Sequence, residues 1–388
     1  MSKPFRFIQG FFLVILLHSC ASTPPIHHSL SQDGIEPLTE LIKLPIGGVE
    51  QWLLIRTANT ENPVFFFLHG GPGAGEMPLL RYFNNELEQY FTVVTWDQRG
   101  AGKSNSRDIP PHSINLDQLR SDTHEIVQYL KNRFNQPKVF IAGHSFGTVL
   151  GIQLVKKHPE NIYAYVGIGQ IVNTKRNTES TCQLGYELAR ETGKKKDISI
   201  FSDIYGNGSS ADVTDLETAL TLNDFLKENG GVYHDRTTFN KLIFAVLTAP
   251  EYTLLDKIKY MSGLKRSREL LWNRDLFEVD FFRDAPRLEV PVYFISGKYD
   301  LIASPELTLE YYNFLSAPEK HLVEFKDSAH CGIFEEPSKF NRLMIDEVLK
   351  HAHPSTDTFG VSTTDLPGDV PGKIRSVIAP GSSLPYTQ

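Results

Sequence analysis

The sequence predicts an α/β fold with a mostly parallel central sheet, an antiparallel hairpin at its start and a helical insertion. Short, continuous apolar runs alternate with helical patterns along most of the chain, which is typical of strands buried on both faces of a parallel sheet. Two apolar runs within 41–59 flank Gly47-Gly48 and predict the hairpin. The alternation stops between about Asn173 and Arg287, where helix-like segments predict a lid over the carboxyl edge of the sheet.

Six buried strands follow the hairpin in this prediction, and helices connect them. Apolar residues recur at helical spacing after Asn115, a residue type that suits the N-cap position of a helix. The insertion divides the predicted core into 41–172 and 288–352 and places the lid at 173–287. The six predicted strands are 64–68, 91–96, 139–142, 163–168, 292–296 and 321–325.

Composition and charge exclude several classes of protein. The 388-residue chain is 40% hydrophobic and 22% charged, as expected of a globular protein with a large core. Its formal net charge is −7 and it has no long basic run, so we expect no nucleic-acid partner. The last segment, 353–388, is rich in Pro, Gly, Ser and Thr and is predicted to be a disordered tail.

The first twenty residues have the pattern of an export signal. A small basic region precedes the apolar run 11–17, which is too short to span a bilayer as a helix. The run continues into "LLHSC". In this stretch Leu17, Ser19 and Cys20 resemble the lipobox of bacterial lipoproteins. This resemblance implies a signal peptide at 1–20, lipidation of Cys20, membrane anchorage in the cell envelope and a tether at 21–40. Secretion without a lipid is the alternative.

The remaining cysteines, Cys182 and Cys331, are too few for a disulfide scaffold in an exported protein. The sequence does not establish a bridge between them, and two unpaired thiols are the simpler expectation.

The stretch 96–104, "WDQRGAGKS", ends like a phosphate-binding loop. That pattern requires a glycine where this chain has Asp97. A carboxylate at that turn would repel phosphate groups, so we expect no nucleotide at Gly102-Lys103-Ser104.

The stretch "GHSFG" carries the pattern of a nucleophile elbow. Gly143, Ser145 and Gly147 follow an apolar strand and open a helix-like run, which is the context that this motif requires. Side chains two residues before and after the serine would collide in the tight turn, and glycine avoids that collision. The turn exposes the Ser145 hydroxyl at the positive end of the following helix. We therefore predict Ser145 as the nucleophile.

A serine nucleophile needs a base, and the base needs an orienting carboxylate. In this kind of fold the acid and then the histidine follow the serine along the chain. Asp300 follows the predicted strand 292–296, and His330 follows 321–325. Because ligands bind at the carboxyl ends of the strands in open α/β sheets, we predict Asp300 and His330 as the partners of Ser145. Asp327 is the alternative acid.

Two backbone N–H groups should stabilise the oxyanion of an acyl-transfer reaction. One is expected from Phe146, directly after the nucleophile, and the other from "HGGPG" after the first buried strand. Gly71 is the predicted second donor, and Gly70 is the alternative. His69 stands in the wrong chain order for a base, so we expect it to hold this loop.

Together, "HGGPG", "WDQRGAGKS", "GHSFG" and the Asp300 and His330 loops resemble the proline iminopeptidase branch of the α/β-hydrolases, over roughly 41–350. The resemblance implies the α/β-hydrolase fold and a serine aminopeptidase that acts on small peptides without a metal or organic cofactor. It also implies that the stretch from Asp97 to Ser104 supports the floor of the active site.

The resemblance weakens in the insertion. Members that release N-terminal proline hold the substrate amine with lid glutamates, typically one near a Trp, whereas Trp272 is followed here by Asn273. Glu251 is the predicted substitute, and Glu179 and Glu187 are alternatives. A carboxylesterase, amidase or lactonase remains a rival function. A binding protein without activity is a further rival, against which the complete set of candidate catalytic residues argues.

Overall fold

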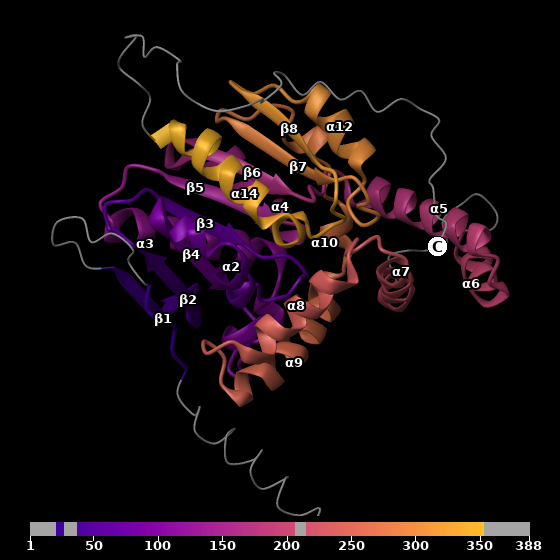
Figure 1. Cartoon of the computed structure of the whole chain (residues 1–388), viewed down its shortest axis with the longest axis horizontal. Coiled ribbons are helices and arrows are strands. Elements are labelled where there is room, and N and C mark those ends of the chain that lie inside the picture. Colours follow the sequence, from indigo (N-terminus) through magenta and orange to yellow (C-terminus); the bar gives the residue numbers. More distant parts are fainter. Residues whose placement is uncertain (1–20, 27–36, 206–214, 353–388) are drawn as a thin grey trace, which may run out of the picture. The chain divides into compact units, whose positions relative to one another are not determined.

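The computed structural model describes residues 21–26, 37–205 and 215–352 (Figure 1). Its centre is an eight-stranded sheet in the order β1-β2-β4-β3-β5-β6-β7-β8. β1 and β2 form an antiparallel hairpin, β2 pairs antiparallel with β4, and the remaining neighbours pair in parallel. The predicted fold class is therefore confirmed. The strands are β1 Leu38–Ile46, β2 Val49–Thr57, β3 Val64–Leu68, β4 Thr92–Asp97, β5 Val139–His144, β6 Ile162–Ile168, β7 Val292–Gly297 and β8 Lys320–Phe325.

Helices cover both faces of the sheet, which explains why every residue of β3, β4, β5 and β7 is buried. On one face, residues of α3 Leu116–Arg133, α4 Phe146–Lys157 and α12 Pro305–Phe314 share a hydrophobic core with the strands. On the other face, the second core includes residues of α2 Met77–Phe83, α13 Gly332–Glu335 and α14 Pro337–Leu343. The Asn115 side chain caps α3 by accepting a hydrogen bond from the backbone N–H of Gln118 at 2.8 Å.

Short helical turns lie between the longer elements of the core and after the last of them. They are Asn85–Gln89, Gly102–Ser104, Pro111–Ser113, Pro159–Asn161, Met344–Val348 and Leu349–Ala352.

The insertion between β6 and β7 is helical in the part that the structure describes, and Figure 1 shows helices α5 to α9 grouped along one side of the sheet. Part of it has a small core of its own, in which Cys182, Phe201, Leu222 and Leu226 pack together. The helices are α5 Thr174–Thr192, α6 Lys195–Tyr205, α7 Leu216–Glu228, α8 Arg236–Thr248, α9 Leu254–Leu271, α10 Arg274–Phe277 and α11 Phe281–Asp284.

Helix α9 is fastened to the loop that follows β4. The Lys103 ammonium forms a buried 2.6 Å ion pair with Asp256, and it lies 4.5 Å from the centre of the Trp52 ring. The Arg266 guanidinium donates to the backbone oxygen of Ser106 at 2.8 Å. Lys103 therefore holds the lid to the core. Its ammonium group is used in a buried ion pair and does not face an open phosphate-binding loop.

The stretch 21–40, predicted to be a tether, contains ordered contacts with the core. β1 begins at Leu38, because its backbone pairs with β2. Near the other end, the Ser22 N–H donates to the Pro250 oxygen at 2.9 Å, and the buried Arg56 side chain donates to Thr23 at 2.6 Å. The predicted signal at 1–20, with Cys20, and the predicted tail at 353–388 lie outside the described residues.

None of the helices described is both long enough and apolar enough to cross a membrane.

Candidate active site

Ser145 occupies a sharp turn between β5 and α4. Its backbone has φ 53° and ψ −120°, an uncommon conformation for a residue with a side chain. A Cβ on Gly143 would lie 2.6 Å from the Gly147 oxygen, and one on Gly147 would lie 2.1 Å from the Leu68 oxygen. The two glycines of "GHSFG" are therefore required by close backbone packing around the turn.

The turn is fixed to the neighbouring strand, which brings it close to the predicted histidine. The Ser145 N–H donates to the Ile168 oxygen at the end of β6, at 2.9 Å. The next residue, Gly169, lies against His330 so closely that a Cβ there would be 2.8 Å from the ring Cε1 atom. Ser145 and His330 thus adjoin the same strand end.

His330 and Asp300 form a buried pair. The ring Nδ1 lies 2.9 Å from one carboxylate oxygen of Asp300 and 3.1 Å from the other. Asp300 also accepts hydrogen bonds from the backbone N–H groups of Ile302 and Ala303, at 2.8 and 2.9 Å. These bonds orient the carboxylate, and the carboxylate orients the imidazole. Asp327, the alternative acid, is exposed, and Asp300 occupies the position beside Nδ1.

A second histidine, His144, supports the His330 loop from within the core. Its Nδ1 lies 2.8 Å from the Glu76 carboxylate, and its Nε2 lies 3.1 Å from the backbone oxygen of His330. Both partners are acceptors, so both ring nitrogens must donate, as only the charged imidazolium can. Burial alone would lower the pKa of His144, but Glu76, together with Cys331, outweighs burial and raises this pKa well above its ordinary value.

The predicted oxyanion donors are backbone N–H groups near Ser145. Phe146 opens α4, and N–H groups in the first turn of a helix have no partner within the helix. The Gly70 N–H already donates to Glu76 at 3.3 Å, whereas Gly71 lines the cavity beside Ser145. This arrangement favours Gly71 over Gly70 as the second donor.

Both ring nitrogens of His69 are used to hold the loops at the base of the site. The Gln98 N–H donates to Nε2 at 3.0 Å, so Nδ1 carries the proton that it shares with the Gly70 oxygen at 2.8 Å. Burial lowers the pKa of His69, which agrees with a neutral ring. This geometry supports the predicted structural role.

Two consecutive glutamates after His330 also hold its loop. Glu335 accepts from the backbone N–H of Ala329 at 2.8 Å and from that of His234, at the start of the α8 region, at 2.6 Å. Glu336 accepts from the Ser328 hydroxyl at 2.7 Å. The loop is thereby tied to both the core and the insertion.

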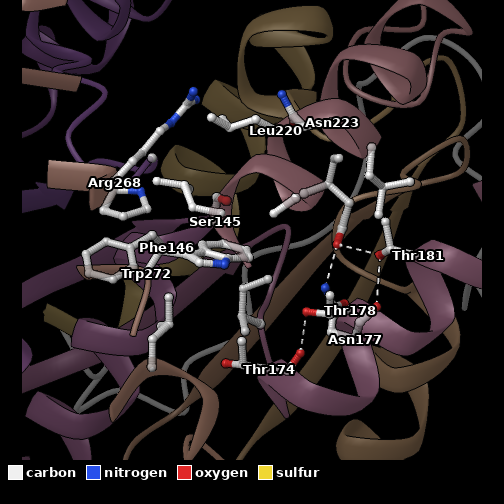
Figure 2. A pocket seen from close by; sticks show the side chains of 18 of the residues that line it. Ser145, Phe146, Thr174, Asn177, Thr178, Thr181, Leu220, Asn223, Arg268 and Trp272 are labelled. Carbon is white, nitrogen blue, oxygen red and sulfur yellow. Dashed lines mark hydrogen bonds between the residues drawn. The ribbon is translucent and has the colours of Figure 1, made fainter. Parts of the chain in front are cut away.

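Ser145 opens onto a cavity of about 150 Å³ between the core and the lid (Figure 2). Most of its lining is apolar, and the charged residue in that lining is Arg268 of α9. Figure 2 shows the Arg268 side chain extending toward the α7 side, where Leu220 and Asn223 lie. Trp272 and Thr174 also line the cavity.

Several polar groups of this lining have no partner. Trp272 Nε1 and Thr174 Oγ1 are buried, and neither forms a hydrogen bond with another described residue. The half-buried Arg268 guanidinium forms neither a hydrogen bond nor an ion pair of 4.0 Å or less with any described side chain. Burial lowers the pKa of Arg268, and more distant groups, Tyr260 and Asp224 first, oppose that effect. An arginine remains charged under such conditions.

The structure does not bring the predicted amine ligand to this cavity. Glu251 is fully buried, forms a 2.5 Å ion pair with Arg81 and accepts a hydrogen bond from Thr23 at 3.1 Å. Glu179 and Glu187, the alternatives, are also absent from the lining.

Cys182 and Cys331 are buried, unpaired thiols. Within the described ranges, no group of three or more His, Cys, Asp or Glu side chains is placed to hold a metal ion.

Sequence reasoning did not identify Glu76, Glu335, Glu336 or Arg268 as parts of this region. For the glutamates a signal existed, because each lies within a few residues of a predicted motif. Arg268 carried no such signal, since a basic residue within a polar helical stretch is typical of a solvated helix face.

Comparison with known proteins agrees with this architecture. Residues 63–193 match the family described as the alpha/beta hydrolase fold. The probable aminopeptidase YbaC of Bacillus subtilis is 37% identical over 310 residues, which cover 80% of this chain and 96% of that protein. Proline iminopeptidase from Mycobacterium smegmatis has a similar structure, with a TM-score of 0.61 at 18% identity, over 81% of this chain and 99% of that one. The chain therefore belongs to the α/β-hydrolase family, together with the probable aminopeptidase of B. subtilis.

Proposed function

We propose that this protein is a serine aminopeptidase that cleaves short peptides through an acyl-enzyme. The observation that carries the proposal is the buried Asp300–His330 pair at the strand end beside Ser145. The relationship to the probable aminopeptidase of B. subtilis supports the reaction class.

In the proposed mechanism, Ser145 attacks the carbonyl carbon of the scissile bond. Nδ1 of His330 faces Asp300, which leaves Nε2 to take the serine proton and then deliver it to the leaving amine. Asp300 stabilises the imidazolium, and the N–H groups of Phe146 and Gly71 bind the oxyanion. Water then attacks the acyl-enzyme with His330 as its base, which releases the product and restores Ser145.

The cavity supports a short peptide as the substrate. It adjoins Ser145, and Arg268 provides an unpaired cation inside it. A cation there attracts the carboxyl end of a peptide and repels the amino end. We therefore place the C-terminal carboxylate of a dipeptide or tripeptide beside Arg268, with the unpartnered Trp272 N–H as a further donor.

One observation favours the second candidate, an esterase or amidase that acts on small molecules. An aminopeptidase that binds a desolvated amine needs a carboxylate in its pocket, and no Asp or Glu is among the described residues that line this cavity. The same catalytic residues would serve either reaction.

We also propose that Cys20 is lipidated and that the protein acts at a membrane of the cell envelope, as its "LLHSC" pattern implies. Replacement of Cys20 by Ser should move the protein from the membrane fraction to the soluble fraction. A wild-type protein that carries no lipid and is found in the soluble fraction would refute this assignment.

The function is tested with a fluorophosphonate probe and a matched set of substrates. The wild-type protein should be labelled, and Ser145→Ala should lose both labelling and turnover while it remains folded; undiminished labelling would refute the nucleophile. Proline, alanine and leucine arylamides, each with a free or acetylated amine, are then compared with short-chain arylesters. Preference for free-amine arylamides supports the peptidase, and equal cleavage of both forms supports the second candidate.

A further inference from the structure

Large apolar side chains are concentrated on the outer face of α8 and α9. On α9, Leu255, Met261 and Ile258 are 68%, 65% and 61% exposed, and Leu254 is exposed beside them. Their positions follow helical spacing, so they share one side of the helix. The outer side of this helix is therefore apolar, although its inner side is already packed on the core.

Helix α8, which lies next to α9 in Figure 1, also carries exposed apolar side chains. Its residues Ile243, Phe244 and Leu247 are exposed and also follow helical spacing. Tyr82 of α2 adds to this group, because its ring lies 6.4 Å from that of Phe244. Single exposed apolar residues are ordinary, whereas a group of this size indicates a surface that contacts something apolar. We call the seven residues of α8 and α9 the apolar face.

The chain that follows Cys20 is bound at the edge of this face. α8 and α9 are joined by the loop 249–253, and Ser22 donates to the Pro250 oxygen in that loop. The Thr23 hydroxyl donates to Glu251 in the same loop. The described chain therefore begins at the loop that joins the two helices of the apolar face.

Basic side chains flank the face. Lys241 of α8 and Lys257 of α9 each lie three residues from a member of the face, and neither forms an ion pair with another described residue. Long basic side chains at the rim of an apolar helix surface suit the head groups of anionic lipids.

We propose that the apolar face rests on a lipid bilayer that contains anionic lipids, next to the attachment point of the N-terminus. A bilayer explains the apolar face, the basic side chains beside it and the N-terminal segment bound at its edge. A second copy of the chain would not require the N-terminus at that edge. The lipid proposed on Cys20 would hold the N-terminus at the bilayer, and a second contact of this kind would fix the orientation of the protein on it. This inference rests on the lipidation of Cys20 proposed above, and it does not depend on the proposed hydrolase activity.

The test uses the full protein as cells export it, bound to vesicles of phosphatidylethanolamine and phosphatidylglycerol. An environment-sensitive fluorophore is placed on Leu255→Cys or, as a matched control, on Phe314→Cys. Phe314 is 51% exposed on α12, outside the apolar face. The native thiols Cys182 and Cys331 are buried, and the sulfur of Cys20 would carry the proposed lipid, so labelling should be confined to the new cysteine. Nitroxide-bearing lipids in the vesicles report contact with the acyl region.

The fluorophore at residue 255 should be strongly quenched by the nitroxide lipids, and that at residue 314 should not. Replacing Ile258 by Asp in the Leu255→Cys protein should abolish the quenching, while hydrolysis of soluble substrates stays unchanged. Exchanging phosphatidylglycerol for phosphatidylcholine should weaken the quenching. Equal quenching at both positions, or none at residue 255, would overturn the proposal. A spectral shift at residue 255 that depends on protein concentration and not on lipid would instead identify a second copy as the occupant.

Discussion

Beneath Ser145, buried polar groups are bonded to one another, whereas some of the polar groups that the lid brings to the cavity have no partner among the described residues. His144 uses both ring nitrogens, for Glu76 and for the His330 backbone. The Trp272 N–H and the Thr174 hydroxyl are buried without a partner on the lid side, and the half-buried Arg268 guanidinium lies beside them in the cavity lining. Unpaired buried polar groups are costly and therefore rare, so they mark places where a ligand completes the bonding. In the proposed mechanism, the paired region would hold the catalytic geometry and the unpaired region would bind the substrate.

The largest expected effect comes from the paired region. Asp300→Asn keeps the shape of the side chain but removes the charge that orients and stabilises the His330 imidazolium. We expect kcat to fall by about 10⁴-fold. Steady-state kinetics on the best arylamide or arylester measures the loss, with thermal unfolding as a control for folding. A loss of less than tenfold would contradict the assignment of Asp300 and return attention to Asp327.

The next effect concerns stability. His144→Gln leaves the buried Glu76 carboxylate without its cationic partner, which should lower the free energy of unfolding by about 3–5 kcal/mol. The raised pKa of His144 gives this contribution a pH dependence. It is fully present below the unfolded pKa of about 6.5 and is lost as the pH rises through the higher folded value.

Urea unfolding of both proteins at pH 6 and pH 9 tests that dependence. The difference between wild type and His144→Gln should be larger at about pH 6 and smaller at about pH 9, because the wild-type imidazolium begins to lose its proton as the pH approaches its folded pKa. A difference that grows with pH would show that His144 is neutral in the folded protein.

A smaller effect is expected in the unpaired region. Arg268→Gln removes the cation from the cavity. It breaks no ion pair or hydrogen bond of the guanidinium with a described side chain, so we expect little effect on folding. We expect kcat/KM to fall about tenfold to a hundredfold for dipeptides with a free carboxylate. The matching dipeptide amides serve as the control and should lose about threefold or less. Equal losses for acids and amides would show that Arg268 does not read the carboxylate.

The smallest catalytic effect is expected at Glu251. Because this carboxylate is buried against Arg81 and does not line the cavity, Glu251→Gln should leave the ratio of kcat/KM for free and acetylated arylamides within about twofold. Its effect should appear in the unfolding free energy instead. A selective loss on free-amine substrates would restore Glu251 as the amine ligand.

The fold could be predicted from the sequence because its signals are local. Continuous apolar runs such as β3 are buried on both faces, and the "GHSFG" glycines are required by contacts two residues from Ser145. The substrate region could not be predicted in the same way. Whether Glu251 or Arg268 faces the cavity depends on how helices distant in sequence pack, and both residues look like ordinary surface charges in the sequence.

The attachment of α9 to the loop after β4 has a consequence for how substrate reaches Ser145. The Lys103–Asp256 and Arg266–Ser106 contacts tie this helix to the sheet, so it should move with the core as one rigid body. Helices α6 and α7 instead contribute to a separate small cluster, which they share with α5. We therefore expect the entrance to open by displacement of α7 away from a stationary α9, with faster amide hydrogen exchange in α7 than in α9.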